Sequence, residues 1–291
     1  MTAASGRHPD EDLLGPMVAA AQGAGKAILA VYRDTDHGVT RKDDDSPLTR
    51  ADLAAHNLIR RQLLAAAALP LVSEEARLAP WEERRQWRRY WLVDPLDGTR
   101  EFISRNGEFT VNIALVDDGV AVLGVIFAPV LGRLYIGQRL GDDRARWRAS
   151  RLEAGGEPLV IRTRPVAACC PASPFTLVAS RRHGRGLATA LSGRLASAFG
   201  AVRHETLGSS LKMCLIAEGA ADLYPRFGPT GEWDTAAAQA IVEAAGGQLC
   251  DLDGTPRRYN GRADAINPSF YAVGDGGVDW PGLLAGIWAG R

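Results

Sequence analysis

The spacing of apolar residues changes near Phe175, and this change constrains the fold more than any other feature of the chain. Ahead of it, three stretches rich in β-branched and aromatic residues follow closely on one another: Phe109 to Val116, Val120 to Ala128 and Arg133 to Gly137. Turn-like sequences separate these stretches, so they predict an antiparallel meander. After Phe175, short strand-like stretches alternate with helical ones, which predicts an α/β arrangement. We therefore expect an α+β half followed by an α/β half.

Helices and short strands are expected on either side of the meander. Apolar residues from Leu13 to Leu29 recur at three- and four-residue spacing, and Thr49 has the character of an N-cap for a second helix. The polar stretch His37 to Pro47 between them is interpreted as a loop. The remaining expected strands are Leu71-Val72, Trp91 to Val93 ending at Asp94, Thr176 to Ala179 and Val202 to His204; the remaining expected helices are Gly186 to Phe199, Ser209 to Glu218 and Asp234 to Ala245.

Charge and cysteine content exclude several classes of protein. The 291 residues contain 34 Lys+Arg and 34 Asp+Glu, so the net charge is zero and gives no electrostatic footprint for nucleic acid. The four cysteines form no CxxC pair, which favours a reducing cytoplasm. The N-terminus lacks the pattern of a signal peptide, and the apolar run Leu63 to Leu71 is too short for an integral membrane span. Peripheral association with the inner membrane is left open.

Four short features place carboxylates beside expected strand ends or helix starts. They are Thr49 to Asp52, Ser73-Glu74-Glu75, Asp94 to Thr99 and Gly231 to Asp234. Magnesium prefers oxygen ligands from carboxylates, water and phosphate, and two such ions can activate water and stabilise the leaving oxygen of a phosphomonoester. Three of these features also have a simpler interpretation: Asp-Pro-x-Asp-Gly is a common turn sequence, Glu74-Glu75 a solvated pair and Asp234 a helix N-cap. The whole set in this order favours a metal site for phosphate esters.

The segment Asp94-Pro95-Leu96-Asp97-Gly98-Thr99 is the centre of this prediction. Pro95 should turn the chain, so that Asp94 and Asp97 face one point with the Leu96 carbonyl between them. Gly98 permits an unusual backbone angle, and a helical turn starting at Thr99 would offer free N–H groups to a phosphate.

Glu74-Glu75, DPLDGT from Asp94 to Thr99, and WDTAAA from Trp233 to Ala238 resemble the signature of the inositol monophosphatase superfamily. Within it, Ser46 to His56, Arg89 to Gly119 and Gly208 to Ala238 are similar to the bacterial 3′(2′),5′-bisphosphate nucleotidases. The resemblance runs from about Leu13 to Phe270. It implies a five-layered αβαβα sandwich, two or three Mg²⁺ ions, lithium sensitivity, and hydrolysis of adenosine 3′,5′-bisphosphate to AMP and phosphate in support of sulfate assimilation.

The resemblance also implies roles for individual residues. The implied metal ligands are Glu74, Asp94, Leu96 through its carbonyl, Asp97 and Asp234, and the implied catalytic residues are Glu74, Thr99 and Asp52. The implied substrate-binding residues are Gly98, Thr99, His183, Ser209, Lys212, Arg226 and Asp234. Arg182 replaces a small residue that is common in the family.

We expect residues 1–12 to be a disordered tail, residues 13–168 to form the half with the antiparallel sheet and the main metal ligands, and residues 169–291 to carry the nucleotide-specificity loops. Val166 to Pro174 is the candidate boundary. The expected partner is a small nucleotide, with no nucleic acid and no membrane span, and the protein is expected to be a monomer or homodimer. The alternatives are an inositol-phosphate or NADP phosphatase on the same scaffold and, more remotely, a non-catalytic nucleotide sensor.

Overall fold

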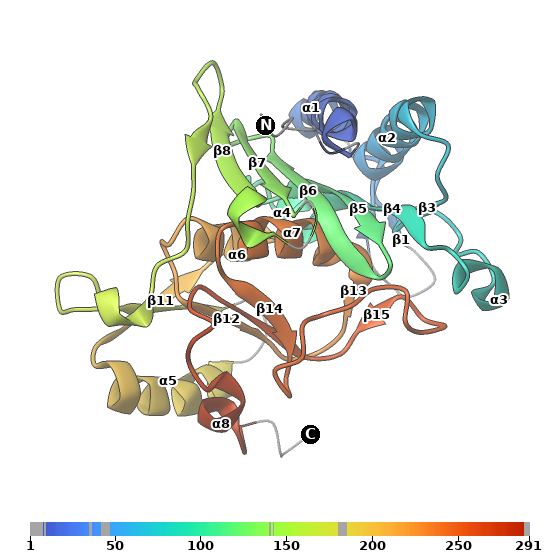
Figure 1. Cartoon of the computed structure of the whole chain (residues 1–291). Helices are drawn as coiled ribbons and strands as arrows, with labels where there is room; N and C mark the ends of the chain where they lie inside the picture. The colour runs from blue at the N-terminus through green and yellow to red at the C-terminus, as the bar shows by residue number, and fades with distance from the viewer. Residues whose placement is uncertain are drawn as a thin grey trace.

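Helices and sheets alternate in five layers (Figure 1). The computed structural model describes residues 8, 10–34, 37–41, 47–139, 141, 143–179 and 185–287, the side chains of 185–190 excepted. The first layer is the helix pair α1 (Glu11–Arg33) and α2 (Arg50–Ala66). The sheet beneath it has the strand order β3-β4-β5-β6-β7-β8-β9. These strands are β3 (Leu71–Ser73), β4 (Arg89–Asp97), β5 (Thr110–Asp117), β6 (Val120–Ala128), β7 (Arg133–Gln138), β8 (Arg148–Glu153) and β9 (Leu159–Val160).

The central layer is made of α6 (Leu211–Ala217) and α7 (Ala236–Ala244), which lie between the two sheets. The second sheet has the order β11-β10-β12-β16-β14. Its strands are β10 (Phe175–Ala179), β11 (Val202–Thr206), β12 (Leu223–Arg226), β14 (Gln248–Asp251) and β16 (Phe270–Val273). Helices α5 (Arg185–Phe199) and α8 (Trp280–Leu284) cover its outer face. The predicted αβαβα sandwich is therefore confirmed.

The smaller elements lie at the edges of these layers. They are α3 (Trp81–Arg84), α4 (Thr99–Ile103), the strand pair β1 (Thr40–Arg41) and β2 (Pro47–Leu48), the strand pair β13 (Thr230–Gly231) and β15 (Ile266–Asn267), and 3₁₀ turns at Arg144–Arg146, Val166–Ala168 and Glu232–Asp234.

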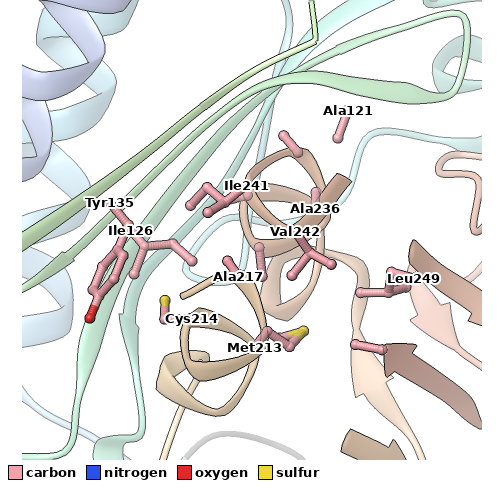
Figure 2. Close-up of a cluster of buried hydrophobic side chains, with 14 of the residues drawn as sticks. Ala121, Ile126, Tyr135, Met213, Cys214, Ala217, Ala236, Ile241, Val242 and Leu249 are labelled. Carbon is pink, nitrogen blue, oxygen red and sulfur yellow. The ribbon is translucent and has the colours of Figure 1, made fainter. Parts of the chain in front are cut away.

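Both faces of the first sheet are buried. Alternate residues of a strand point to opposite faces, so Val111 and Ile113 of β5 pack with α1 and α2, while Ala114 and Val116 pack toward α6 and α7. A strand buried on both sides needs a continuous apolar run rather than an alternating one, which explains the composition of the meander. Figure 2 shows the inner cluster, where Ile241 of α7 lies between the first sheet and the second.

Two glycines set how closely α7 approaches the first sheet. Gly124 of β6 and Gly137 of β7 face each other across the strand pair. A Cβ atom on Gly124 would lie 2.2 Å from the Ala237 carbonyl oxygen, and one on Gly137 would lie 2.5 Å from the Ile241 Cα. The sheet and the alanine-rich helix therefore meet backbone to backbone, and Asp234 comes just before this helix.

Most predicted elements are confirmed, and several boundaries are corrected. Glu11 and Asp12 form the first turn of α1 and do not belong to a tail. The predicted loop from His37 contains β1 and β2, which pair with each other. Strand β4 does not end at Asp94 but continues to Asp97. The meander also extends beyond the prediction into β8 and β9.

The second sheet is mixed rather than parallel throughout. Strand β10 pairs in parallel with β11 and β12, but β16 runs antiparallel to both β12 and β14. Helix α7 belongs to the C-terminal half by sequence, yet it packs on β5, β6 and β7 of the N-terminal half. The two predicted halves thus share one core, and their division at residue 168 stays a prediction.

Helix α1 is long and apolar enough to meet the criterion for a membrane span, and it is the one such helix found in the described part of the chain. In the fold, its residues Met17, Ala20, Ala24 and Ile28 are fully buried against α2 and the first sheet. The helix therefore contributes to the core.

Candidate active site

A bulge in β4 brings two carboxylates to the same side of the first sheet. Asp94 pairs with Asn112 and Asp97 pairs with Thr110, so three steps along β4 match two steps along β5. In a regular strand Asp94 and Asp97 would face opposite sides, because side chains alternate. The extra residue restores them to one side. Pro95 lies in this bulge, where its missing N–H is tolerated.

The third carboxylate comes from the other half of the chain. Asp234 ends the 3₁₀ turn before α7, and its Oδ2 accepts a hydrogen bond from the Gly231 N–H at 2.9 Å. The N-cap position of α7 belongs to Thr235, so the simple reading of Asp234 as the cap of this helix is wrong. Carboxylate oxygens of Asp94, Asp97 and Asp234 all lie within 4.8 Å of one another.

Glu74 joins this cluster through the parallel pairing of β3 and β4. Ser73 is in register with Val93, and the Glu74 N–H donates to the Val93 carbonyl at 3.2 Å, so Glu74 lies beside Asp94. Burial raises the pKa of Asp94 well above its ordinary value, and the carboxylates of Glu74, Asp97 and Asp234 raise it further. Burial and the same kind of repulsion raise the pKa of Asp234.

These residues fit a magnesium ion. Asp94 is buried, and Glu74, Asp97 and Asp234 are half-buried beside it. These four acidic side chains repel one another, and a cation bound among them would relieve that repulsion. All of their donors are carboxylate oxygens, the ligands that Mg²⁺ prefers. Glu74, Asp94, Asp97 and Asp234 would therefore hold Mg²⁺.

Asp52 and Thr99 lie together beside the bulge. The Thr99 hydroxyl donates to Asp52 Oδ1 at 3.4 Å and lies 3.5 Å from the Leu96 carbonyl oxygen. Asp52 is fully buried, and its Oδ2 accepts from the Thr49 N–H at 2.7 Å and from the Thr49 hydroxyl at 2.5 Å. Thr49 caps α2 as predicted, so the helix cap also fixes the Asp52 carboxylate.

The expected helical turn after Gly98 is present as α4, which begins at Thr99. Gly98 has φ +92°, in the left-handed region that a residue with a Cβ rarely adopts. A side chain there would also approach the Glu108 carbonyl and the Ser209 Cβ. The predicted use of an unusual backbone angle at Gly98 is confirmed.

A cavity of about 180 Å³ opens onto the carboxylate cluster. Its lining includes Asp97, Gly98 and Asp234 together with Ser209, Lys212 and Arg226. Predicted metal ligands and predicted substrate-binding residues therefore share one cavity. His183 and the rest of the Ser180–His183 segment lie outside the described residues.

Lys212 is a buried cation in this cavity. Its ammonium donates to the Ser209 carbonyl oxygen and lies 5.4 Å from the centre of the Tyr224 ring. Burial lowers the pKa of Lys212, while the nearby Asp97 carboxylate raises it. Arg226 provides a second cation, and it donates to the Pro229 carbonyl at 3.3 Å.

Sequence reasoning missed the polar groups that hold Asp97. Ser210 and Asn112 donate hydrogen bonds to its Oδ2, at 2.6 Å and 3.3 Å. Thr110 and Asn112 are two residues apart in β5, so they lie on one face of an otherwise apolar strand. This polar pair within an apolar stretch is the sequence pattern that could have identified the groups around Asp97. No comparable pattern indicates that the Tyr224 ring lies beside the Lys212 ammonium.

The fold is an αβαβα sandwich, and the site is a carboxylate centre open to a cavity that Lys212 and Arg226 line. The model of the inositol monophosphatase family matches residues 10–274, and the chain belongs to this family.

Curated relatives narrow the resemblance to one branch of the family. The chain is 46% identical over 252 residues to the 3′(2′),5′-bisphosphate nucleotidase CysQ of Shigella flexneri, covering 86% of this chain and 95% of that protein. It is 45% identical over 253 residues to CysQ of Escherichia coli K12, with the same coverage.

Two solved structures of the family resemble the chain over most of its length. The crystal structure of CysQ from Bacteroides thetaiotaomicron superposes with a TM-score of 0.74 at 39% identity, covering 89% of this chain and 96% of that one. An inositol monophosphatase from Zymomonas mobilis has a TM-score of 0.70 at 28% identity, covering 95% and 98%.

Proposed function

We propose that the protein hydrolyses adenosine 3′,5′-bisphosphate to AMP and phosphate, as a magnesium-dependent 3′(2′),5′-bisphosphate nucleotidase. One observation carries the proposal: a single cavity joins the carboxylate centre at Asp97 and Asp234 to the cations Lys212 and Arg226. A substrate with two phosphates suits this combination, because one phosphate could bind at the carboxylate centre with its metal and the other against the two cations. The names of the relatives that cover most of the chain agree with this substrate.

The carboxylate centre would hold the phosphate that is cleaved. We propose that Glu74, Asp94, Asp97, Asp234 and the Leu96 carbonyl hold two or three Mg²⁺ ions. When bound, Mg²⁺ supplies Lewis-acid stabilisation of the phosphate oxygens and activation of water. The backbone N–H groups of Gly98 and Thr99 would orient the scissile phosphate, because α4 begins at this point.

The attacking water would be held by the chain's own side chains. Thr99 donates its hydroxyl hydrogen toward Asp52, so the lone pairs of its oxygen can accept a hydrogen bond from water. Glu74 lies beside Asp94 and supplies a second acceptor. We propose that Glu74 and Thr99 orient the water and that Asp52 fixes Thr99 and promotes activation of the water.

The second phosphate would lie against Ser209, Lys212 and Arg226, with His183 as a further predicted contact. The buried ammonium of Lys212 beside the Tyr224 ring is desolvated, and a charge-assisted hydrogen bond from such a group is strong. These residues would distinguish a bisphosphate nucleotide from a simple monophosphate.

The test is a side-by-side measurement of kcat/KM with Mg²⁺ on adenosine 3′,5′-bisphosphate, inositol 1-phosphate and NADP⁺. We expect the bisphosphate to be the preferred substrate. Faster turnover of inositol 1-phosphate or NADP⁺ would favour one of the two alternative phosphatase functions. Binding of the bisphosphate with Mg²⁺ but without release of phosphate would favour a nucleotide sensor.

The cellular setting is part of the same proposal. Adenosine 3′,5′-bisphosphate is the nucleotide that remains when phosphoadenylyl sulfate gives up its sulfate. By hydrolysing it to AMP and phosphate, the enzyme would support sulfate assimilation. We propose a soluble cytoplasmic enzyme, monomeric or homodimeric, that Li⁺ inhibits. Fractionation, size-exclusion chromatography with light scattering and a Li⁺ titration of activity test these points.

A further inference from the structure

Asp97 receives hydrogen bonds from both halves of the chain. Ser210 N–H and the Asn112 side-chain amide donate to Oδ2 at 2.6 Å and 3.3 Å, and the Thr110 hydroxyl lies 3.5 Å from the same oxygen. Asn112 and Thr110 belong to β5, whereas Ser210 precedes α6 in the C-terminal half. The Ser210 N–H and the Asn112 amide donate to the same oxygen, which leaves Oδ1 to face a cation.

The donors also fix one another. The Ser210 hydroxyl donates to Asn112 Oδ1 at 2.8 Å and lies 2.8 Å from the Thr110 hydroxyl oxygen. Thr110, Asn112 and Ser210 are each at most 1% exposed. The amide of Asn112 thus uses its nitrogen toward Asp97 and its oxygen toward Ser210. A buried network in which the members satisfy one another holds a single geometry.

The segment Gly208 to Lys212 is attached to the N-terminal half at two points. The Gly208 N–H donates to Glu108 Oε2 at 2.8 Å, and the Ser210 N–H donates to Asp97. Ser209 between them has φ +48°, a left-handed backbone conformation that costs energy in a residue with a side chain. The Lys212 ammonium then reaches back to the Ser209 carbonyl. The two attachments therefore determine where Lys212 lies.

We propose that Thr110, Asn112 and Ser210 are positioning residues that couple Mg²⁺ binding at Asp97 to phosphate binding beside Lys212. The coupling half of this inference rests on the proposed function. A cation on Asp97 that fixes its carboxylate also fixes the Asn112 amide that donates to it. The Ser210 hydroxyl, bonded to Asn112 Oδ1, passes this order to the loop that carries Ser209 and Lys212, and the Ser210 N–H alone does not suffice. By linkage, a phosphate that orders this loop must strengthen Mg²⁺ binding by the same factor.

Matched threonine variants test the positioning role. Thr110→Val removes one hydroxyl from a fully buried strand residue that contacts Ser210 and Asp97. Thr176→Val removes one hydroxyl from an equally buried residue of β10, whose side chain donates to the Pro174 carbonyl instead. Ser210→Ala removes the hydroxyl that joins Thr110 to Asn112 but keeps the backbone N–H on Asp97.

Mg²⁺ affinity is measured by calorimetry without nucleotide, and thermal unfolding of each variant is recorded with EDTA. Loss of a group that orients a metal ligand lowers metal affinity about 10–100-fold, so we expect about a 10-fold loss for Ser210→Ala and a smaller loss for Thr110→Val. Thr176→Val should bind Mg²⁺ like the wild type, even if its unfolding temperature falls. Equal Mg²⁺ affinities in all three variants would overturn the positioning role.

The coupling is measured with AMP, which retains only the 5′-phosphate. The ratio of AMP dissociation constants without and with Mg²⁺ should be about 10 for the wild type, within the 5–150-fold range typical of coupled sites. It should fall toward one in Ser210→Ala, and an unchanged ratio, or a wild-type ratio of one, would overturn the coupling. Cooperative binding of AMP and Mg²⁺ by a wild-type enzyme that prefers inositol 1-phosphate would refute the proposed function alone.

Discussion

Gly137→Ala should impair the active site from a distance, through helix α7. The added Cβ would lie 2.5 Å from both the N and Cα atoms of Ile241 and 2.6 Å from the Ala240 carbonyl carbon. Carbon atoms in contact prefer about 3.5–4.0 Å, so the helix must retreat by about 1 Å. These neighbours are backbone atoms, which cannot move aside by changing a rotamer.

Gly137→Ala should lower both the free energy of unfolding and kcat/KM, and the two losses have different sizes. An added methyl group in a packed core typically costs about 1–3 kcal/mol of unfolding free energy. Asp234 lies two residues ahead of α7, so the same shift displaces one carboxylate of the cluster. A misplacement of about 1 Å in a catalytic constellation can cost on the order of 100-fold in rate. We expect kcat/KM to fall by about that factor.

The assay compares urea unfolding with kcat/KM on adenosine 3′,5′-bisphosphate at a temperature where every variant is folded. Gly193→Ala in α5 is the control, because a Cβ there meets no atom within 4 Å apart from the backbone of its own helix. A glycine replaced by alanine within a helix gains about 0.5–1 kcal/mol, so this control should be as stable as the wild type or more so, with unchanged activity. Wild-type kcat/KM in folded Gly137→Ala would show that the position of α7 does not control the Asp234 carboxylate.

Three further predictions concern the charges of the site. Asp94→Asn should lower kcat by more than about 100-fold, and near-normal turnover would contradict the metal assignment. The EDTA-treated variant should unfold at the same or a higher temperature than the wild type, because a buried carboxylate that its acidic neighbours repel is removed. The raised pKa values of Asp94 and Asp234 mean that the metal-free folded chain binds more protons than the unfolded chain, so their stabilising contribution is complete below about pH 4 and is lost as pH rises through the raised values. The difference in unfolding temperature between Mg²⁺ and EDTA should therefore widen from pH 5 to pH 8, and a constant difference would contradict the repulsion argument. Lys212→Ala should raise KM for adenosine 3′,5′-bisphosphate about 10–100-fold, corresponding to a charged hydrogen bond of about 1.5–3 kcal/mol, with little change for a simple monophosphate ester; equal effects on both substrates would exclude a role in specificity.

The sequence alone determined the features that depend on neighbouring residues. The cap of α2 followed from Thr49 and the residues just after it, and the meander followed from β-rich stretches separated by turn residues. The kind of chemistry also followed, because the two carboxylates and the one glycine from Asp94 to Gly98 keep their ligand properties and backbone freedom in any context. The limits of β4 did not follow, since a bulge depends on how β4 pairs with β5.

Only the tertiary structure decided how the site is assembled. Asp234 meets Asp94 and Asp97 because α7 packs on the first sheet, and Gly124 and Gly137 allow that approach from two other strands. The anchoring of Asp97 by Asn112 and Ser210 likewise joins residues far apart in the chain. Such contacts depend on the relative placement of packed elements, which local residue preferences do not specify. The sequence therefore predicted which carboxylates form the site. The packing of the elements decided that these carboxylates meet and which groups hold Asp97 in place.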